Sequence, residues 1–214
     1  MAVSAKLERP IQPANRFERR RRRNRQALID AAIDLFQQHG IRGAKIEEIC
    51  ARADVAPRTF FNNFVTREHL YREIAQQRAA RMAALFEAAA DGPRPVRERL
   101  PELFGRIADY LDERPLYREL VGEMLHIRLD GGSEIVRDRS LGRAARHFVA
   151  SGVARGEIGE RVRPEVLADL LLGALNTALA NWSASPSYDL RRELREAADA
   201  LLLLFNPAAP TGRR

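Results

Sequence analysis

The sequence predicts an all-α protein. Apolar residues recur at helical spacing along most of the 214 residues, and no stretch alternates apolar with polar residues as a half-buried strand would. Apolar residues make up 45% of the chain, enough to build a packed core. The breaks between the periodic stretches carry proline, glycine or serine, as helix ends do.

The first third of the chain predicts a basic arm followed by three short helices. Residues 1–20 hold few periodic apolar residues, so we expect a flexible basic arm there. A helix is expected from about Asn24 to Gly40, which fits a C-terminal cap glycine. A second helix covers about 45–53, and a tight turn containing Asp54 leads to a third helix that Pro57 opens at its first turn.

The third helix lies in the stretch VAPRTFFNNF, residues 55–64. Phe60 and Phe64 are four residues apart, so they share one face and can anchor a short helix in the core. We expect its polar side chains to face outward, namely Arg58, Thr59, Asn62 and Asn63. Arginine can read guanine, asparagine can read adenine, and threonine offers a methyl group and a hydroxyl. An ordinary surface helix is the alternative interpretation.

Six further helices are predicted. The first of them starts at Thr66, a good N-cap residue, and runs to about Ala89. The others are expected at about 95–113, 115–128, 133–154, 164–184 and 188–205.

Positive charge is concentrated at the N-terminal end. Residues 1–67 hold 14 Lys and Arg against 7 Asp and Glu, while residues 68–214 hold 22 of each. All of the net charge of +7 therefore lies in the first third, centred on the arginine run 19–23. This asymmetry favours a polyanionic partner for the N-terminal part, with a solubilising tail as the alternative.

Composition also excludes some classes of protein. No run approaches the roughly 18 consecutive apolar residues that a membrane helix needs, and the N-terminus lacks the apolar core of an export signal. Cys50 is the only cysteine, which excludes an internal disulfide or a site of several thiolates. We expect a cytoplasmic protein with no metal, no cofactor and no membrane contact.

Residues 46–70 read IEEICARADVAPRTFFNNFVTREHL, and this pattern resembles the TetR family of bacterial transcription regulators. The positions that fit the family pattern are Ile46, Ile49, Ala53, Val55, Thr59, Phe60, Phe64, Glu68 and Leu70. The resemblance implies a helix-turn-helix DNA-binding domain over 21–66, an effector-binding and dimerisation domain over 67–206, and a C-terminal tail over 207–214. The second domain resembles the family only in helix count and length.

The resemblance also implies a DNA-binding surface, made of Lys45, Pro57, Arg58, Thr59, Phe61, Asn62, Asn63 and Arg67. Three of these depart from the family pattern. Lys45 stands where a threonine often begins the second helix, and Phe61 stands where a tyrosine commonly donates its hydroxyl to a phosphate. Arg67 replaces a lysine that commonly contacts phosphate, which an arginine can do with two hydrogen bonds.

An effector pocket is expected between the helices of the second domain. Its candidate lining residues are Met82, Phe86, Phe104, Tyr110, Met124, His126, His147, Phe148, Asn176 and Trp182. Plain core packing is the alternative for each. Asn176 stands out, because a buried amide in the apolar stretch 170–182 would need a partner that a ligand could supply.

The last helix is apolar on most sides, so it needs cover on most sides. A second subunit is the natural cover, and the resemblance implies a homodimer built from the last two helices. The candidate interface residues are Leu194, Leu201 and Phe205.

The favoured interpretation is a ligand-responsive DNA-binding regulator, a repressor that a small molecule releases from a palindromic operator in double-stranded DNA. One alternative is an all-α module that binds RNA or an anionic surface through its arginine-rich arm. The other is an all-α enzyme, which the sequence disfavours because it has no phosphate-binding loop, no nucleophile elbow, no dinucleotide fingerprint and no paired-histidine metal motif.

Overall fold

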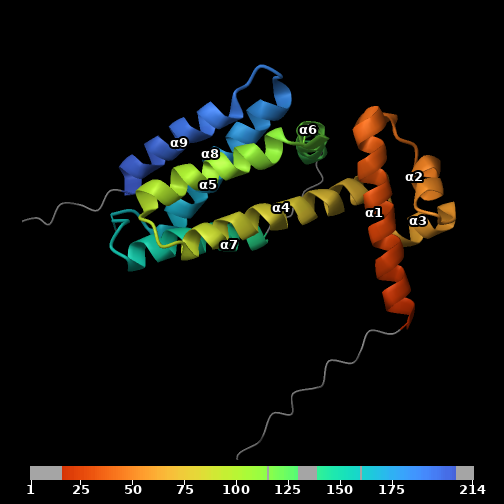
Figure 1. Cartoon of the computed structure of the whole chain (residues 1–214), viewed down its shortest axis with the longest axis horizontal. Helices are drawn as coiled ribbons and strands as arrows, with labels where there is room; N and C mark the ends of the chain where they lie inside the picture. The colour runs from red at the N-terminus through yellow and green to blue at the C-terminus, as the bar shows by residue number, and fades with distance from the viewer. Residues whose placement is uncertain (1–15, 115, 130–138, 160, 206–214) are drawn as a thin grey trace, which may run out of the picture. The chain divides into compact units, whose positions relative to one another are not determined.

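The computed structural model describes residues 16–114, 116–129, 139–159 and 161–205, with the side chains of 124–129 and 139 outside the description. The regular structure in these ranges is entirely α-helical (Figure 1), so the predicted fold class is confirmed. The helices are α1 (Arg16–Gly43), α2 (Ile46–Arg52), α3 (Pro57–Asn63), α4 (Arg67–Asp91), α5 (Val96–Asp112), α6 (Leu116–Leu129), α7 (Arg139–Ala154), α8 (Pro164–Ala184) and α9 (Leu190–Phe205). Within the described part of the chain, no helix could cross a membrane.

The chain divides into two compact units between Arg67 and Glu68. The N-terminal unit contains α1, α2 and α3, and the C-terminal unit contains α4 to α9. Arg67 is both the last residue of the N-terminal unit and the first residue of α4.

Helix α1 begins earlier than the sequence predicted. Residues 16–20, expected in a flexible arm, are helical, and Arg19–Arg23 lie exposed on the first turns. Arginine has a high helix propensity, and Glu18 pairs with Arg22 across one turn at 3.8 Å. At the other end, Gly40 has φ 72° and interrupts the helical path, as expected of a cap glycine.

A Schellman motif joins α2 to α3. The Val55 N–H donates to the Cys50 carbonyl at 3.0 Å, and the Asp54 N–H donates to the Ala51 carbonyl at 3.2 Å. Asp54 has φ 52°, so it takes the left-handed position of the tight turn predicted there, a conformation that aspartate tolerates. Pro57 then occupies the first turn of α3, as predicted.

The core of the N-terminal unit draws on all three of its helices. Its buried apolar residues include Leu28, Ala32, Phe36, Ile49, Cys50, Phe60 and Phe64. The rings of Phe60 and Phe64 lie 5.6 Å apart between centroids, which confirms that they anchor α3. Burial, reinforced by the charge of Glu47, raises the pKa of the Cys50 thiol, so this side chain behaves as a small hydrophobe.

The C-terminal unit is a helical bundle. Helix α5 packs along α9, and α8 packs against α6, α7 and α9. Phe86 of α4 meets Phe148 of α7 edge to face, with ring centroids 6.3 Å apart. Both rings are fully buried, so they form part of the core.

Leu194, Leu201 and Phe205 are not on a free surface. Each is at most 5% exposed within its own chain, because α5 and α8 cover this stripe of α9. The structure therefore does not support the prediction that they meet a second subunit. The large apolar residues that these two last helices leave exposed are Leu203 and Leu204 of α9 and Leu170 of α8.

A buried ion pair links α5 to the segment after α7, and its arginine also bonds the end of α4. The Arg99 side chain is 3% exposed, and its Nη1 donates to the carbonyls of Ala89 and Ala90, each at 2.9 Å. Its Nη2 donates to Glu157 Oε2 at 2.8 Å, and the same oxygen accepts the Val96 N–H at 2.8 Å. The pair thus satisfies backbone groups that helix ends leave without helical partners.

Replacing Glu157 with alanine leaves the Arg99 guanidinium buried without its carboxylate. We expect the free energy of unfolding to fall by about 3 kcal/mol. Glu102→Ala is the matched control, because the Arg94–Glu102 pair is exposed and contributes about 1 kcal/mol or less. Urea denaturation of both variants measures the two losses in free energy of unfolding. Equal losses would mean that burial does not increase the contribution of the Arg99 pair to stability.

Candidate nucleic-acid interface and ligand pocket

Helix α3 turns Arg58 and Asn62 away from the core. Arg58 and Asn62 are exposed and four residues apart, so they share one face. Neither side chain makes a hydrogen bond or ion pair with any residue that the structure describes. Pro57 is exposed and Thr59 is half-buried beside them. This face can offer an arginine fork and an amide to base edges.

Phe61 adds an exposed ring to the same surface. It is 54% exposed, and its ring meets Phe60 edge to face with centroids 5.4 Å apart. The contact with a fully buried ring supports Phe61 in its exposed position. This position therefore offers apolar contact and no hydroxyl donor.

Asn63 does not face outward as predicted. It is 7% exposed, and its Nδ2 donates to the Thr59 carbonyl at 2.7 Å. Its own backbone carbonyl accepts a hydrogen bond from Arg25 Nη1 at 2.7 Å. Asn63 is the last residue of α3, where carbonyls lack helical partners, and a cation on α1 supplies one. Its role is thus to hold α3 against α1.

Arg25 was not singled out from the sequence. Besides its bond to Asn63, its guanidinium lies over the Phe64 ring at 4.5 Å from the centroid. Helical spacing could have found it, because Arg25 lies three residues before Leu28 and four before Ile29, both of which are buried.

The two basic candidates outside α3 differ in exposure. Lys45 is exposed just before α2, and its backbone N–H donates to Glu48 Oε2 at 3.1 Å. Arg67, predicted to contact phosphate, is half-buried, and its Nη2 donates to the carbonyls of Ile41, at 2.6 Å, and Ala44. Carbonyls near a helix end attract a cation, which explains why Arg67 is less exposed than Lys45. Both bonds lie within the N-terminal unit, of which Arg67 is the last residue.

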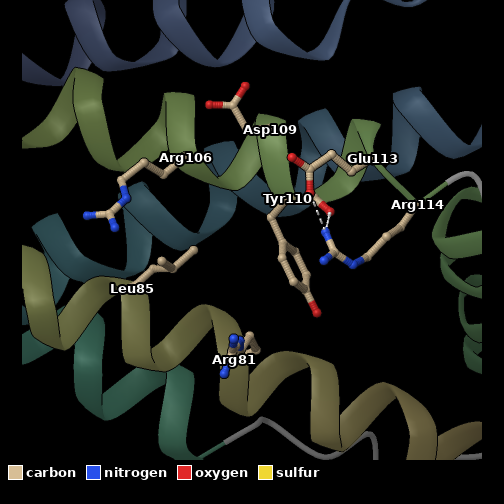
Figure 2. Close-up of a pocket in the computed structure, with 7 residues that line it drawn as sticks. All are labelled: Arg81, Leu85, Arg106, Asp109, Tyr110, Glu113 and Arg114. Atoms are coloured by element: carbon tan, nitrogen blue, oxygen red, sulfur yellow. Dashed lines mark hydrogen bonds and ion pairs between the residues drawn. The ribbon is translucent and has the colours of Figure 1, made fainter.

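A cavity of about 310 Å³ lies between α4 and α5 (Figure 2). It is lined by Arg81 and Leu85 of α4, Arg106, Asp109 and Tyr110 of α5, and Glu113 and Arg114 just after α5. Tyr110 points from α5 toward α4, and Leu85 points from α4 toward α5 (Figure 2). Among the predicted pocket residues whose side chains the structure describes, Tyr110 is the one that lines this cavity.

Four other predicted pocket residues belong to the core. Phe86, Phe104, Phe148 and Trp182 are each at most 2% exposed. Met82 is half-buried on α4 and does not line the cavity. The side chains of Met124 and His126 lie outside the described residues.

The last two predicted pocket residues face solvent. His147 is exposed, and its Nδ1 pairs with Glu87 Oε2 while its Nε2 lies 3.9 Å from Asp91. Asn176 is exposed on α8, so its amide needs no buried partner. The sequence around it is apolar on nearly all sides, and periodicity therefore could not tell which face of α8 is covered.

Comparison with known proteins gives a family match for the segment that contains α3. Residues 28–74 match the family model described as bacterial regulatory proteins, tetR family. The chain carries the helix-turn-helix domain of the TetR family. The match contains α2, the Schellman turn and α3, whose exposed face was described above.

TetR-family relatives extend the likeness beyond this domain. The HTH-type transcriptional repressor DhaR of Mycobacterium sp. (strain GP1) is 24% identical over 162 residues, 72% of this chain and 80% of DhaR. The HTH-type transcriptional regulator UidR of Escherichia coli (strain K12) is 24% identical over 173 residues, 79% of this chain and 85% of UidR.

A solved TetR-family structure shares the fold. FadR from Thermus thermophilus, a transcriptional repressor in complex with lauroyl-CoA, superposes with a TM-score of 0.69 at 22% identity. The superposition covers 89% of this chain and 99% of FadR. With its TetR domain and these relatives, the chain is a DNA-binding transcription regulator.

Arg58→Ala and Asn62→Ala should each lower operator affinity by about 1–3 kcal/mol if the side chain contacts a base. Thermal stability should barely change, because neither side chain is buried. Asn63→Ala is the contrasting variant, since it loses a buried hydrogen bond and about 1 kcal/mol of stability. Binding titrations and thermal melts separate the two effects. Wild-type operator affinity in both exposed variants would show that α3 does not read the bases.

Proposed function

We propose that this TetR-type regulator is a homodimeric repressor that a small molecule releases from a palindromic operator. It acts in the cytoplasm, by binding rather than by catalysis. The observation that carries the proposal is the path of α4. Its first residue, Arg67, bonds to carbonyls of the N-terminal unit, and two turns of the same helix supply Arg81 and Leu85 to the cavity. One continuous helix therefore connects a ligand site to the reading unit.

A ligand acts on such a helix by selecting one arrangement of it. If the ligand binds the cavity better in one placement of α4 against α5, it shifts the population toward that placement. The Arg67 bonds then transmit the change to the carbonyls of Ile41 and Ala44. A coupling free energy of about 1–3 kcal/mol lowers operator affinity roughly 5- to 150-fold. The FadR neighbour, a repressor in complex with lauroyl-CoA, supports a ligand-responsive mode.

The dimer is needed because α3 has only seven residues. A reading helix of this length covers few base pairs, too few for selectivity against a genome of competing sites. We place the second subunit on the apolar residues that α8 and α9 leave exposed, Leu170, Leu203 and Leu204. Large apolar side chains exposed on neighbouring helices favour a protein interface.

Leu203→Glu combined with Leu204→Glu should produce a folded monomer, because association would bury two unpaired charges. The monomer should lose specific operator binding and keep weak, salt-sensitive affinity for any DNA. Leu201→Ala is the contrasting variant, since Leu201 is 5% exposed and its truncation should cost about 2–5 kcal/mol of stability instead. Sedimentation velocity with operator titration checks this. A double variant that stays dimeric would place the interface elsewhere.

Selection of binding sites from random duplexes tests the function as a whole. We expect inverted half-sites with centres about 10 base pairs or a multiple apart, protected at physiological salt. Placed ahead of a reporter gene, the selected site should reduce transcription when the protein is present, and Arg58→Ala should relieve the reduction. Binding with no preferred sequence would favour an RNA or anionic surface as the partner of the arginine run. Raised transcription would refute the assignment as a repressor.

A further inference from the structure

We propose that the cavity between α4 and α5 binds a small organic anion, one that joins a carboxylate or similar group to an apolar body. The role of this anion as the effector rests on the proposed function. Its binding does not, because it can be measured on the protein without DNA.

The two carboxylates in the cavity lining are already compensated. Glu113 Oε2 accepts a hydrogen bond from Arg114 Nη1 at 2.9 Å, and both residues belong to the lining. Asp109 pairs with Arg191 of α9. In Figure 2 the Asp109 carboxylate points away from α4, on the far side of α5 from Tyr110. Neither acid therefore neutralises the remaining cations of the cavity.

Arg81 and Arg106 are those remaining cations. They line the open cavity from the helices on its two sides, Arg81 from α4 and Arg106 from α5 (Figure 2). Neither makes a hydrogen bond or ion pair with any residue in the described ranges. A guanidinium presents donors in a planar fork that fits a carboxylate or a phosphate. Two such forks beside one cavity favour an anionic ligand.

Tyr110 forms a fixed wall between these charges. Its ring stacks on Tyr117 of α6 with centroids 5.6 Å apart and an interplanar angle of 22°, and the Arg114 guanidinium lies over it at 4.5 Å. The Tyr110 and Tyr117 hydroxyl oxygens are 3.4 Å apart, so only one of the two needs to donate to the other. One hydroxyl hydrogen is thus left to donate to a ligand.

Burial raises the pKa of Tyr117, and the hydrogen bond that its hydroxyl makes to Tyr110 raises it further, so Tyr117 stays protonated near neutral pH. The ring edge of Tyr110 and the side chain of Leu85 give the cavity an apolar part (Figure 2). An inorganic anion would leave this part unfilled, which is why the ligand needs an apolar body.

The size of the cavity limits that body. A volume of about 310 Å³ is at the lower end of the range for ligand pockets, roughly 300–1,000 Å³. It suits a compact molecule of one or two rings or a short chain rather than a nucleotide carrying a long acyl group.

Fluorescence titration with 1-anilinonaphthalene-8-sulfonate, a two-part aromatic anion, tests the proposal on full-length protein without DNA. We expect one saturable site per chain in the wild type. Arg81→Gln with Arg106→Gln should weaken its affinity at least about tenfold, because two charge-assisted hydrogen-bonding groups are lost. Arg97→Gln, which changes an exposed arginine of α5 outside the cavity lining, should leave it unchanged. N-phenyl-1-naphthylamine, the same rings without the sulfonate, should bind the double variant as well as it binds the wild type.

Three outcomes overturn the proposal. These are no saturable binding to the wild type, equal affinity in the wild type and the double variant, and displacement of the dye by inorganic phosphate as readily as by benzoate. Operator affinity, measured with and without the dye, is a separate readout. If the dye binds through Arg81 and Arg106 but does not change operator affinity, the proposed anion site stands. The proposal that a ligand in this site releases the operator is then refuted.

Discussion

The C-terminal unit depends on one arginine that joins three chain segments. Arg99 donates hydrogen bonds to two carbonyls in the last turn of α4. Glu157, which follows α7, accepts hydrogen bonds from this guanidinium and from the first N–H of α5. Arg155 adds bonds to the carbonyls of Ala90, at 3.0 Å, and Gly92, at 2.6 Å. Each of these buried polar groups would cost about 1–3 kcal/mol if it lost its partner, so loss of one bond should destabilise this corner. These bonds fix the angle between α4 and α5, and that angle shapes the cavity between the two helices.

Bonds from arginine to backbone carbonyls occur at both ends of α4. At its start, Arg67 donates to carbonyls beyond the main body of α1, and at its end Arg99 and Arg155 donate to its own last carbonyls. Arginine suits these positions because it stays charged and offers several donors in one plane. Between the two ends, Arg81 and Leu85 meet no such fixed partner in the described structure, and they line the cavity.

Local spacing was enough to predict the helices and the two rings that anchor α3. Phe60 and Phe64 lie one turn apart, and Pro57 fits only the first turn of a helix. Residues 55–64 were therefore enough to predict α3. The same spacing places Asn63 three residues after Phe60, on the buried side, but its polar side chain outweighed its position in the prediction. In so short a helix, a capping role and a reading role look alike in sequence.

Long-range packing was beyond the sequence pattern. The stripe of Leu194, Leu201 and Phe205 was identified correctly as apolar, yet its cover comes from α5 and α8, which no local period specifies. The cavity was missed for another reason, since the prediction favoured aromatic and methionine residues and the lining is mostly charged. Ion pairs such as Asp109 with Arg191 join residues far apart in sequence, so a single sequence cannot show which charges are left uncompensated.

The pairing of α5 with α9 also sets an order of events during synthesis. The N-terminal unit is complete once Arg67 has left the ribosome, because its contacts join neighbours in sequence. Helix α5 makes its most extensive contact with α9, the last described helix, which is synthesised much later. Until then its apolar face stays uncovered, which makes this interval the one in which a nascent chain is most prone to aggregate or to need a chaperone.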